Sequence, residues 1–513
     1  MPERFFITTA IDYVNGKPHL GHAYEKVLTD FLARFHRRAG DEVFFLTGVD
    51  EHGLKVQQSA QKEGVEPKVL CDRNAALFRA LYDRLGVSYD DFIRTTEDRH
   101  KHVVRLILQK LFDAGEIYAG DYEGYYSPKQ EQFLTEKEMV DGKFPAEYGD
   151  VITLKEPVYF FRLEKHRAWL QDFIRSNPDW IFPAFRSKEV LGALENPIGD
   201  LCISRPKSRL AWGIPLPFDE DQVTYVWFDA LINYISGIGY AGEGIDPRWP
   251  AVHVIGKDIM VPAHAVYWPI MLKALGLPLP KQLLVHGFWL RNQEKMSKSV
   301  GNVVDPLDVI DVYGVDAFRY FVLREMALGQ DADFSPEQFH QRYQSELGNN
   351  LGNLVNRTVS MVGRYREGVV PVPEASTLTP ADEALRADLL AGIATYRELV
   401  GKLQIHMALV ELWRVITRAN QYVEESAPWK LAKDPASSPR LDRVLAEMTS
   451  ALVVLLAELQ PLLPQTVEKA RGQLGGLTLP AGVDDPAWPV LPAQLRLGAP
   501  EPLFPRIEIV PAV

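Results

Sequence analysis

Apolar residues in the first sixty positions alternate between a strand-like and a helix-like spacing. Residues 5–10 form a short apolar run, and the apolar positions between 27 and 35 recur at the three- and four-residue intervals of one helix face. Gly40 follows as a helix stop, and residues 43–46 form a fully apolar run typical of a strand buried in a parallel sheet. This order predicts a doubly wound α/β domain with ligands at the carboxyl ends of its strands.

The alternation is interrupted and then resumes. Residues 116–225 are rich in Tyr, Pro and Gly and are predicted to be an insertion. We expect the strands and helices of the α/β domain to return with the apolar runs at 225–228, 252–255 and 283–286. From about residue 340 the apolar positions recur at helical spacing, with stripes over 409–423 and 452–463, which predicts a helical bundle.

Size and charge limit the class of protein. The 513 residues exceed a single core and predict roughly two to four domains. The apolar share of 46% and charged share of 24% are typical of a soluble globular protein. The net charge of −12 argues against nonspecific coating of nucleic acid, so we expect no DNA partner. It does not exclude an RNA partner, because whole-chain charge says nothing about a basic stripe on one face.

The number of cysteines and the length of the apolar runs indicate the cellular compartment. Cys71 and Cys202 are too few for a disulfide framework, which favours a reducing compartment. The strand-like run begins at residue 5 and leaves no room for a signal peptide. No apolar stretch reaches the ~18–20 residues that span a bilayer. We therefore expect a cytoplasmic protein with no membrane partner.

Two segments far apart in sequence carry the chemistry of a triphosphate site. His19 and His22 flank Gly21 before a predicted helix, where imidazole N–H groups would meet phosphate at an anion-favouring helix N-terminus. Lys295 and Lys298 lie on a loop and could neutralise charge as pyrophosphate leaves. Either fragment alone is more often a satisfied histidine pair, a zinc pair or a solvated face. The two segments together predict a single site in an α/β domain, where the histidines and the lysines face one bound nucleotide.

The full strings P-H-L-G-H at 18–22 and K-M-S-K-S at 295–299 resemble the HIGH and KMSKS signatures of class I aminoacyl-tRNA synthetases. The surrounding residues resemble the methionyl-tRNA synthetase family. The resemblance implies ATP, as its Mg²⁺ complex, as substrate, and makes His19, His22, Lys295 and Lys298 the expected catalytic residues. The residues that it implies for ATP binding are His19, Gly21, His22, Gly256, Asp258, His286, Lys295, Met296, Ser297 and Lys298.

Three further segments resemble the family's methionine pocket: residues 10–16, the W-F-D-A-L segment at 227–231, and the G-K-D, His and Y-W-P positions between 256 and 269. Aromatic walls suit a flexible, polarisable thioether, and a polar group near the sulfur, from Tyr13 or His264, would help to reject aliphatic rivals. Without the resemblance Trp227 and Tyr234 would be assigned to core packing. The residues that it implies for methionine binding are Ala10, Ile11, Tyr13, Asp50, Trp227, Ala230, Leu231, Tyr234, His264 and Tyr267.

The chain departs from the family pattern at three places. It carries one more residue than expected between Asp258 and His264, and Asp12 stands where the family often has an apolar residue or proline, so Asp12 receives no role. Many relatives have a cysteine-ligated zinc knuckle in the insertion. Here the corresponding positions are Ser127, Gln130, Phe144 and Glu147, none a thiolate or imidazole, so we expect a metal-free knuckle held by apolar packing.

The helical part resembles the family's anticodon reader at Asn353, Arg357, Pro428 and Trp429. An aromatic platform with amide and guanidinium donors suits the splayed bases of a tRNA loop, although a tryptophan after proline is as readily a helix-end residue packed into the bundle. Three residues of the stretch that joins the catalytic part to the bundle are assigned structural roles only. These are Asp305, Asp316 and Arg319.

The resemblance implies a Rossmann-like class I synthetase catalytic domain with an inserted connective domain, followed by an all-α anticodon-binding helical bundle. The expected divisions are 1–115, 116–225, 226–290, 291–345 and 346–513. The implied activity joins L-methionine, through methionyl-adenylate, to the 3′ end of tRNA(Met), in a monomer. Two alternatives are a catalytically silent tRNA-binding paralogue and a class I synthetase for another amino acid. The insertion at 116–225 is too short to form an editing domain, which argues against the class I enzymes that need one. Two scattered cysteines do not supply the zinc site of a cysteinyl enzyme.

Overall fold

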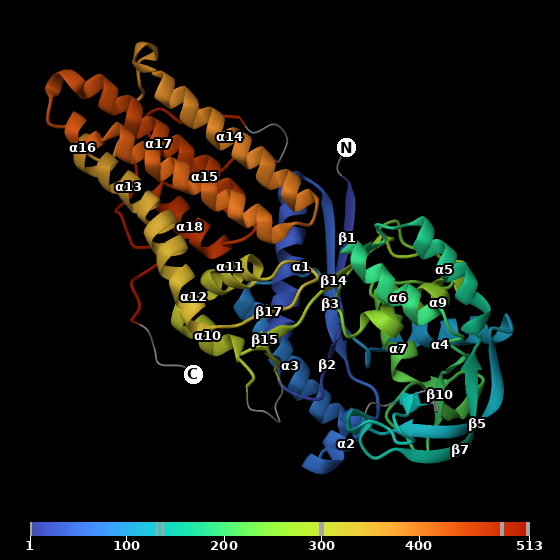
Figure 1. Cartoon of the computed structure of the whole chain (residues 1–513). Coiled ribbons are helices and arrows are strands. Elements are labelled where there is room, and N and C mark those ends of the chain that lie inside the picture. The colour runs from blue at the N-terminus through green and yellow to red at the C-terminus, as the bar shows by residue number, and fades with distance from the viewer. Residues whose placement is uncertain (1–2, 130–131, 135–137, 297–301, 483–486, 509–513) are drawn as a thin grey trace.

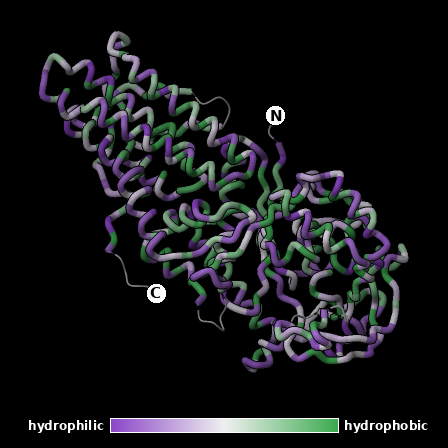
Figure 2. Tube along the Cα trace, in the orientation of Figure 1, coloured by the Kyte–Doolittle hydropathy of each residue, from purple (hydrophilic) through white to green (hydrophobic). Residues whose placement is uncertain are grey.

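The structure is a computed structural model that describes residues 3–129, 132–134, 138–296, 302–482 and 487–508. A central parallel sheet is flanked by a helical bundle on one side and by a smaller, largely antiparallel part on the other (Figure 1). Apolar residues gather inside all three parts and polar residues outside (Figure 2). The predicted architecture, an α/β domain with a parallel sheet followed by an all-α bundle, is confirmed.

The central sheet has the strand order β2-β3-β1-β13-β14-β8, and β4 also pairs with β3. All of its strand pairs are parallel, so the carboxyl ends of the strands meet at one edge, where α/β proteins bind ligands. The strands are β1 Arg4–Thr9, β2 Asp12–Tyr13, β3 Glu42–Asp50, β4 Asp91–Arg94, β8 Ile181–Phe182, β13 Val252–Gly256 and β14 Gln282–His286.

Helix α1, Leu20–Ala39, crosses from β2 to β3 as the apolar spacing predicts. Val27, Leu28, Phe31 and Leu32 are each at most 2% exposed. Each such side chain contributes about 1.5–3 kcal/mol on burial. Gly40 ends the helix at φ 92°, a left-handed conformation that suits glycine. This helix therefore brings its N-terminus, with the histidine pair, to the ligand edge of the sheet.

The apolar run at residues 225–228 returns the chain to the α/β domain as a helix. This apolar run does not continue the sheet; it opens helix α7, Val226–Leu231, which is followed by α8, Asn233–Ser236. A short apolar run does not distinguish a buried strand from a buried helix. The runs at 252–255 and 283–286 do form strands, β13 and β14.

The segment predicted as an insertion forms an antiparallel layer. Strands β5, Ile117–Ser127, and β7, Ile152–Phe161, pair along most of their length. The chain also returns to the central sheet within this segment, because β8 pairs in parallel with β14. The other elements are β6 Gln132–Leu134, α5 Arg167–Ser176, α6 Ser187–Leu194, β9 Leu201–Cys202, β10 Ser204–Pro206, β11 Pro215–Leu216 and β12 Asp219–Thr224.

Helices complete the catalytic part and form the bundle. In the catalytic part they are α2 Leu54–Glu63, α3 Pro67–Leu85, α4 Asp98–Asp113, the π-helix η5 Met260–Tyr267 and α9 Trp268–Leu275. Strands β15 Trp289–Arg291, β16 Glu294–Lys295 and β17 Ala332–Asp333 form a small sheet, with two helices between β16 and β17 in sequence. The later helices are α10 Pro306–Tyr313, α11 Val315–Glu325, α12 Pro336–Arg342, η6 Tyr343–Gly352, α13 Asn353–Arg366, α14 Pro380–Gly401, α15 Ile405–Ser426, α16 Pro428–Leu431, α17 Ser438–Leu459 and α18 Pro464–Gln473.

Candidate active site and tRNA-facing residues

A cavity of about 1080 Å³ opens at the carboxyl edge of the central sheet. Its walls come from the ends of β1, β3, β13 and β14, the start of α1, helices α7 and η5, and the β15–β16 turn region. Every residue predicted to bind ATP or methionine lines this cavity, apart from Ser297 and Lys298, which lie outside the described residues. The histidine pair and Lys295 thus face one common space, as the sequence hypothesis requires.

The histidine pair is built into the start of α1. The His19 ring accepts the Gly21 N–H at Nδ1 over 3.1 Å, and the His22 ring accepts the His19 N–H at Nδ1 over 3.1 Å. Burial lowers the pKa of His22, so this ring is neutral near pH 7. An imidazole that accepts at Nδ1 carries its proton at Nε2. The fold therefore holds His22 in the tautomer that can donate to an anion.

Gly21 is required by the imidazole beside it. A Cβ at this position would lie 3.1 Å from Cε1 of His19, closer than side chains normally approach. The two rings lie with their centroids 3.9 Å apart. A larger residue at position 21 would displace the His19 ring from this arrangement, which is a local reason for glycine here.

Lys295 and Met296 approach the cavity from β16 and the residue after it. The Lys295 Nζ lies 4.1 Å from the centre of the Phe288 ring, which also lines the cavity. A cation–π contact of this kind is weak enough to be exchanged for a phosphate oxygen. Lys295 is exposed, so the contact holds its ammonium at the cavity wall without burying it.

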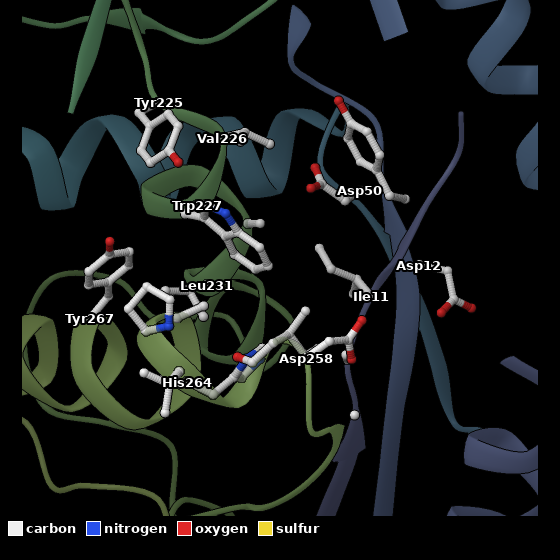
Figure 3. Close-up of a pocket in the computed structure, with 18 of the residues that line it drawn as sticks. Ile11, Asp12, Asp50, Tyr225, Val226, Trp227, Leu231, Asp258, His264 and Tyr267 are labelled. Atoms are coloured by element: carbon white, nitrogen blue, oxygen red, sulfur yellow. The ribbon is translucent and has the colours of Figure 1, made fainter. Parts of the chain in front are cut away.

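The opposite wall is aromatic and apolar (Figure 3). Ile11 lies in residues 10–16, which follow β1 and are called the strand-end segment below, and it points toward Trp227 of α7. Tyr267 and Leu231 line the space beside them. Asp50, the last residue of β3, also lines it. This combination offers a carboxylate for an ammonium group and an apolar, aromatic slot for a side chain.

A hydrogen-bonded pair lies at the base of this wall. The His264 ring donates from Nδ1 to the carbonyl of Ile259 over 2.8 Å, so its Nε2 accepts the hydroxyl of Tyr234 over 2.7 Å. Burial lowers the pKa of His264 to about 4, which keeps the ring neutral. Both ring nitrogens are committed to protein groups. His264 can therefore contact a ligand through its ring face or through Tyr234, and the hypothesis that Tyr13 or His264 approaches the sulfur stays a prediction.

The additional residue predicted between Asp258 and His264 falls in an irregularly wound segment. Residues Met260–Tyr267 form a π-helix that is interrupted at Val261, where φ is −111° and ψ is 127°, and the His264 N–H bonds to the carbonyl of Ile259, five residues earlier, over 3.2 Å. Wide turns of this kind are frequent at functional sites. His264 and Tyr267 both line the cavity.

Two buried charge clusters near the cavity were missed from the sequence. The Asp229 carboxylate receives His52 Nδ1 at 2.6 Å and His100 Nε2 at 2.7 Å. Burial alone would raise the pKa of Asp229, but the two imidazoles lower it to about 2. This cluster ties α7 to α4 and to the turn after β3. Its one sequence signal is a carboxylate inside the apolar W-F-D-A-L segment.

The second cluster lies on α1. Lys26 is fully buried and pairs with Asp12 at 3.0 Å and with Glu25 at 2.8 Å. Glu25 in turn contacts His286, with 3.2 Å between Oε2 and Nε2. Burial would raise the pKa of Glu25, but the neighbouring cations lower it to about 2. The signal available in the sequence is that Glu25 and Lys26 follow His22 at i+3 and i+4 and so share its helix face.

The predicted anticodon residues lie on neighbouring helices of the bundle. The Arg357 guanidinium is 5.4 Å from the centre of the Trp429 ring and 2.6 Å from the Glu424 carboxylate. Asn353 is exposed one helical turn before Arg357 on α13. Pro428 is buried and begins α16, so it anchors Trp429, whose ring is half-buried. The structure therefore supplies a ring with polar donors beside it.

The described part of the knuckle is held by hydrogen-bonding and aromatic contacts. The Ser127 hydroxyl donates to the carbonyl of Tyr148 over 2.5 Å, and the Phe144 ring packs against Tyr125 with 5.0 Å between centroids. Gln130 lies outside the described residues. Within the described ranges, no group of three or more His, Cys, Asp or Glu side chains is arranged to hold a metal ion.

Among the helices described, none is long and apolar enough to span a lipid bilayer.

Comparisons with known proteins agree along the whole chain. The family model "tRNA synthetases class I (M)" matches residues 5–152 and 148–359, and "Anticodon binding domain of methionyl tRNA ligase" matches 372–509. The methionine–tRNA ligase of Deinococcus radiodurans is 44% identical over 98% of this chain and 74% of its own length. That of Brucella melitensis is 42% identical over 98% of both. The Mycobacterium tuberculosis methionyl-tRNA synthetase in complex with methionyl-adenylate has 38% identity and a TM-score of 0.90, covering 99% of this chain and 100% of that one.

Proposed function

The chain belongs to the class I methionyl-tRNA synthetase family and catalyses the methionine–tRNA ligase reaction, and we propose that the cavity at the sheet edge is its active site. The observation that carries this proposal is that the histidine pair of α1 and Lys295 line one cavity together with the aromatic slot. The methionine carboxylate would attack the α-phosphate of ATP there, forming methionyl-adenylate and releasing pyrophosphate. The adenylate would then pass its acyl group to the 3′ end of tRNA.

The ATP side would work by positioning and charge neutralisation. We assign the Nε2 donors of His19 and His22 to the phosphates, because their Nδ1 atoms already accept backbone N–H groups. Lys295, joined by Lys298, would leave the Phe288 ring to meet the β- and γ-phosphates as negative charge builds on the leaving pyrophosphate. Gly256, Asp258 and His286 would complete the nucleotide site.

The methionine side would use Asp50 for the α-ammonium and the wall of Ile11, Trp227 and Leu231 for the side chain. The Tyr234 hydroxyl gives its one proton to the neutral His264 ring, so the hydroxyl proposed to donate to the thioether sulfur is that of Tyr13, which also lines the cavity. Backbone groups of Ala10 are already engaged, since its N–H bonds to Val254 and its carbonyl accepts the Lys26 ammonium. The Asp50 carboxylate is therefore the principal partner proposed for the α-ammonium of methionine.

We further propose that ATP enters as its Mg²⁺ complex, with the cation as part of the substrate, since a triphosphate carries the charge that attracts it. The monomer that the resemblance implies stays a proposal. The buried thiols of Cys71 and Cys202 suit a reducing compartment such as the cytoplasm.

One variant tests activation and tRNA reading separately. Replacing Trp429 with alanine is expected to lower kcat/KM for tRNA charging about 10- to 100-fold, because stacking on one base is worth about 1–3 kcal/mol. Methionine-dependent ATP–pyrophosphate exchange should stay at the wild-type rate, because α16 lies at the end of the bundle remote from the catalytic sheet (Figure 1).

The matched control is Trp488→Ala, which removes another Trp–Arg contact, 5.6 Å to Arg386, in the same region of the chain. This control should charge tRNA like the wild type. Equal losses in the two tryptophan variants would mean that Trp429 only packs the bundle. Absence of methionine-dependent exchange in the wild-type protein, with tRNA still bound, would instead identify a silent paralogue.

His264 makes the stability of the protein depend on pH. Its pKa is about 4 in the folded protein against 6.5 in an ordinary environment, so below pH 6.5 the unfolded chain binds the additional proton. The His264 contribution is therefore complete above pH 6.5 and is lost as the pH falls toward 4, by at most about 3 kcal/mol.

The measurement is the free energy of unfolding of the wild type and of His264→Gln between pH 7.5 and 4.5. Glutamine can accept the Tyr234 hydroxyl but does not titrate, so the wild type should lose stability faster than the variant as the pH falls. A difference between the two proteins that stays constant across this range would contradict a neutral, buried His264.

A further inference from the structure

The Lys26 ammonium joins the two walls of the cavity. It is 0% exposed and has three acceptors: the Ala10 carbonyl at 3.1 Å, the Asp12 carboxylate at 3.0 Å and the Glu25 carboxylate at 2.8 Å. A lysine has three N–H donors, so its hydrogen-bonding capacity is filled. Two of the acceptors belong to the strand-end segment and the third belongs to α1.

Each carboxylate extends the contact to another element. The second oxygen of Asp12 accepts the hydroxyl of Tyr82, which is fully buried on α3. The second oxygen of Glu25 faces His286 at the end of β14. The network therefore reaches from α3, through the strand-end segment and α1, to the strand that leads toward Lys295. The resemblance assigned roles to Ala10 and His286 but none to Lys26, Asp12, Glu25 or Tyr82.

The strand-end segment presents alternate residues to opposite sides. Ile11 points into the cavity toward Trp227, whereas the Asp12 carboxylate points away from it, toward α1 and α3 (Figure 3). The hydrogen bonds from Lys26 to the Asp12 carboxylate and to the Ala10 carbonyl thus fix the position of the backbone that carries Ile11. The same ammonium is anchored on α1, one turn after His22.

A buried lysine with two carboxylates is an expensive way to stabilise a fold. Taking these charges out of water costs several kcal/mol per ion, and well-packed apolar residues often do as well or better. A network of this kind is more readily understood where a fixed geometry is needed, and here it lies directly behind both substrate walls. Burial disfavours the ammonium, but Asp12 and Glu25 outweigh it and raise the pKa of Lys26, so the charge persists.

We propose that Lys26 is a positioning residue of the adenylation reaction, which fixes the methionine-binding segment at residues 10–13 against the ATP-binding start of α1. This inference rests on the proposed function of the cavity. Lys26 touches neither substrate; it sets the separation of the methionine carboxylate and the α-phosphate through Ala10, Asp12 and Glu25. Small displacements of reacting groups can reduce rates by up to about 100-fold.

Two variants separate positioning from stability. Lys26→Met keeps the side-chain stem but leaves two buried carboxylates without their cation, so it should lose both stability and activity. The double variant Asp12→Asn/Lys26→Met restores the net charge of the wild-type network, since one negative and one positive charge are removed together. It still lacks the hydrogen bond to the Ala10 carbonyl.

The double variant should regain most of the wild-type melting temperature while kcat for methionine-dependent ATP–pyrophosphate exchange stays about 10- to 100-fold low, with a raised KM for methionine. Recovery of melting temperature, kcat and KM together would overturn the proposal, because the lysine would then act only by balancing charge. Loss of melting temperature with unchanged kcat and KM in Lys26→Met would overturn it as well.

The proposed function is judged separately, on the wild-type protein alone. If the wild type shows no methionine-dependent exchange, the assignment of the cavity fails. If the wild type is active and the double variant is equally active, only the role of Lys26 fails. Lys402→Met, which removes an exposed lysine at the end of α14 paired with Glu398, is the matched control and should leave both readouts at wild-type values.

Discussion

Lys295→Ala is expected to slow methionyl-adenylate formation by about 10²- to 10³-fold, with little change in the Kd for methionine. The ammonium of Lys295 lines the same cavity as His19 and His22, so we assign it to the phosphates and not to the amino acid. Negative charge on those phosphates grows as pyrophosphate departs, and a cation placed to meet it stabilises the transition state more than the bound substrates. Single-turnover adenylation and equilibrium methionine binding measure the two quantities.

A matched control is Lys281→Ala, an exposed lysine just before β14, at the opposite end of that strand from His286. It should adenylate at the wild-type rate, which shows that removing a surface charge is harmless in itself. Equal losses of adenylation rate and methionine affinity in Lys295→Ala would mean that the segment around Lys295 has been assigned to the wrong substrate.

Arg319→Met is expected to destabilise the protein by about 3–5 kcal/mol, the cost of breaking a buried ion pair from one side. The Arg319 side chain is 0% exposed, and Nη2 lies 2.7 Å from the Asp30 carboxylate. Its other N–H groups donate to the carbonyls of Leu85, Pro461 and Leu462. The substitution leaves a buried carboxylate and three carbonyls without this donor. The structural role predicted for Arg319 thus depends on its contacts with Asp30, Leu85, Pro461 and Leu462.

Arg319 holds three parts of the chain together: α1 through Asp30, the end of α3, and the turn between α17 and α18. Burial would raise the pKa of Asp30, but Arg319 and Arg34 lower it, so the aspartate is charged at neutral pH. Nearby, Arg38 of α1 pairs with Glu458 of α17 at 2.9 Å, a second connection between α1 and the bundle.

Chemical denaturation of Arg319→Met measures the expected loss, and Asp30→Asn/Arg319→Met should recover part of it, because the uncompensated carboxylate is removed. Arg414→Met, an exposed arginine on α15 paired with Glu411, serves as the control and should unfold like the wild type. A change below about 1 kcal/mol in Arg319→Met would show that the guanidinium adds nothing beyond an apolar side chain at this place.

Local patterns predicted the elements that depend on neighbours in sequence. The apolar spacing at 27–35 with Gly40 is sufficient to specify α1, because helix periodicity and a left-handed stop are properties of a few adjacent residues. The runs at 43–46 and 283–286 likewise specify β3 and β14. The run at 225–228 could be either a strand or a helix on sequence alone, because a short apolar segment satisfies both, and only its packing makes it the start of α7.

The site shows the same division. The motif strings identify His19, His22 and Lys295 without any structure, and the cavity contains all three. The sequence could not show that both ring nitrogens of His264 are taken up by Ile259 and Tyr234, because hydrogen bonds between distant elements have no periodic trace. The same holds for the cluster of His52, His100 and Asp229, contributed by three separated segments.

The amino-acid sequence by itself determined the family, the reaction and the residue types of the site, because these follow from short strings whose chemistry is local. Only the tertiary structure decided which atoms of those residues remain available to a substrate. It placed the ammonium of Lys26 between two segments that line the cavity, and the guanidinium of Arg319 between the catalytic part and the bundle. Buried charges are tolerated only where several distant groups converge on them, and that convergence is a property of the folded chain.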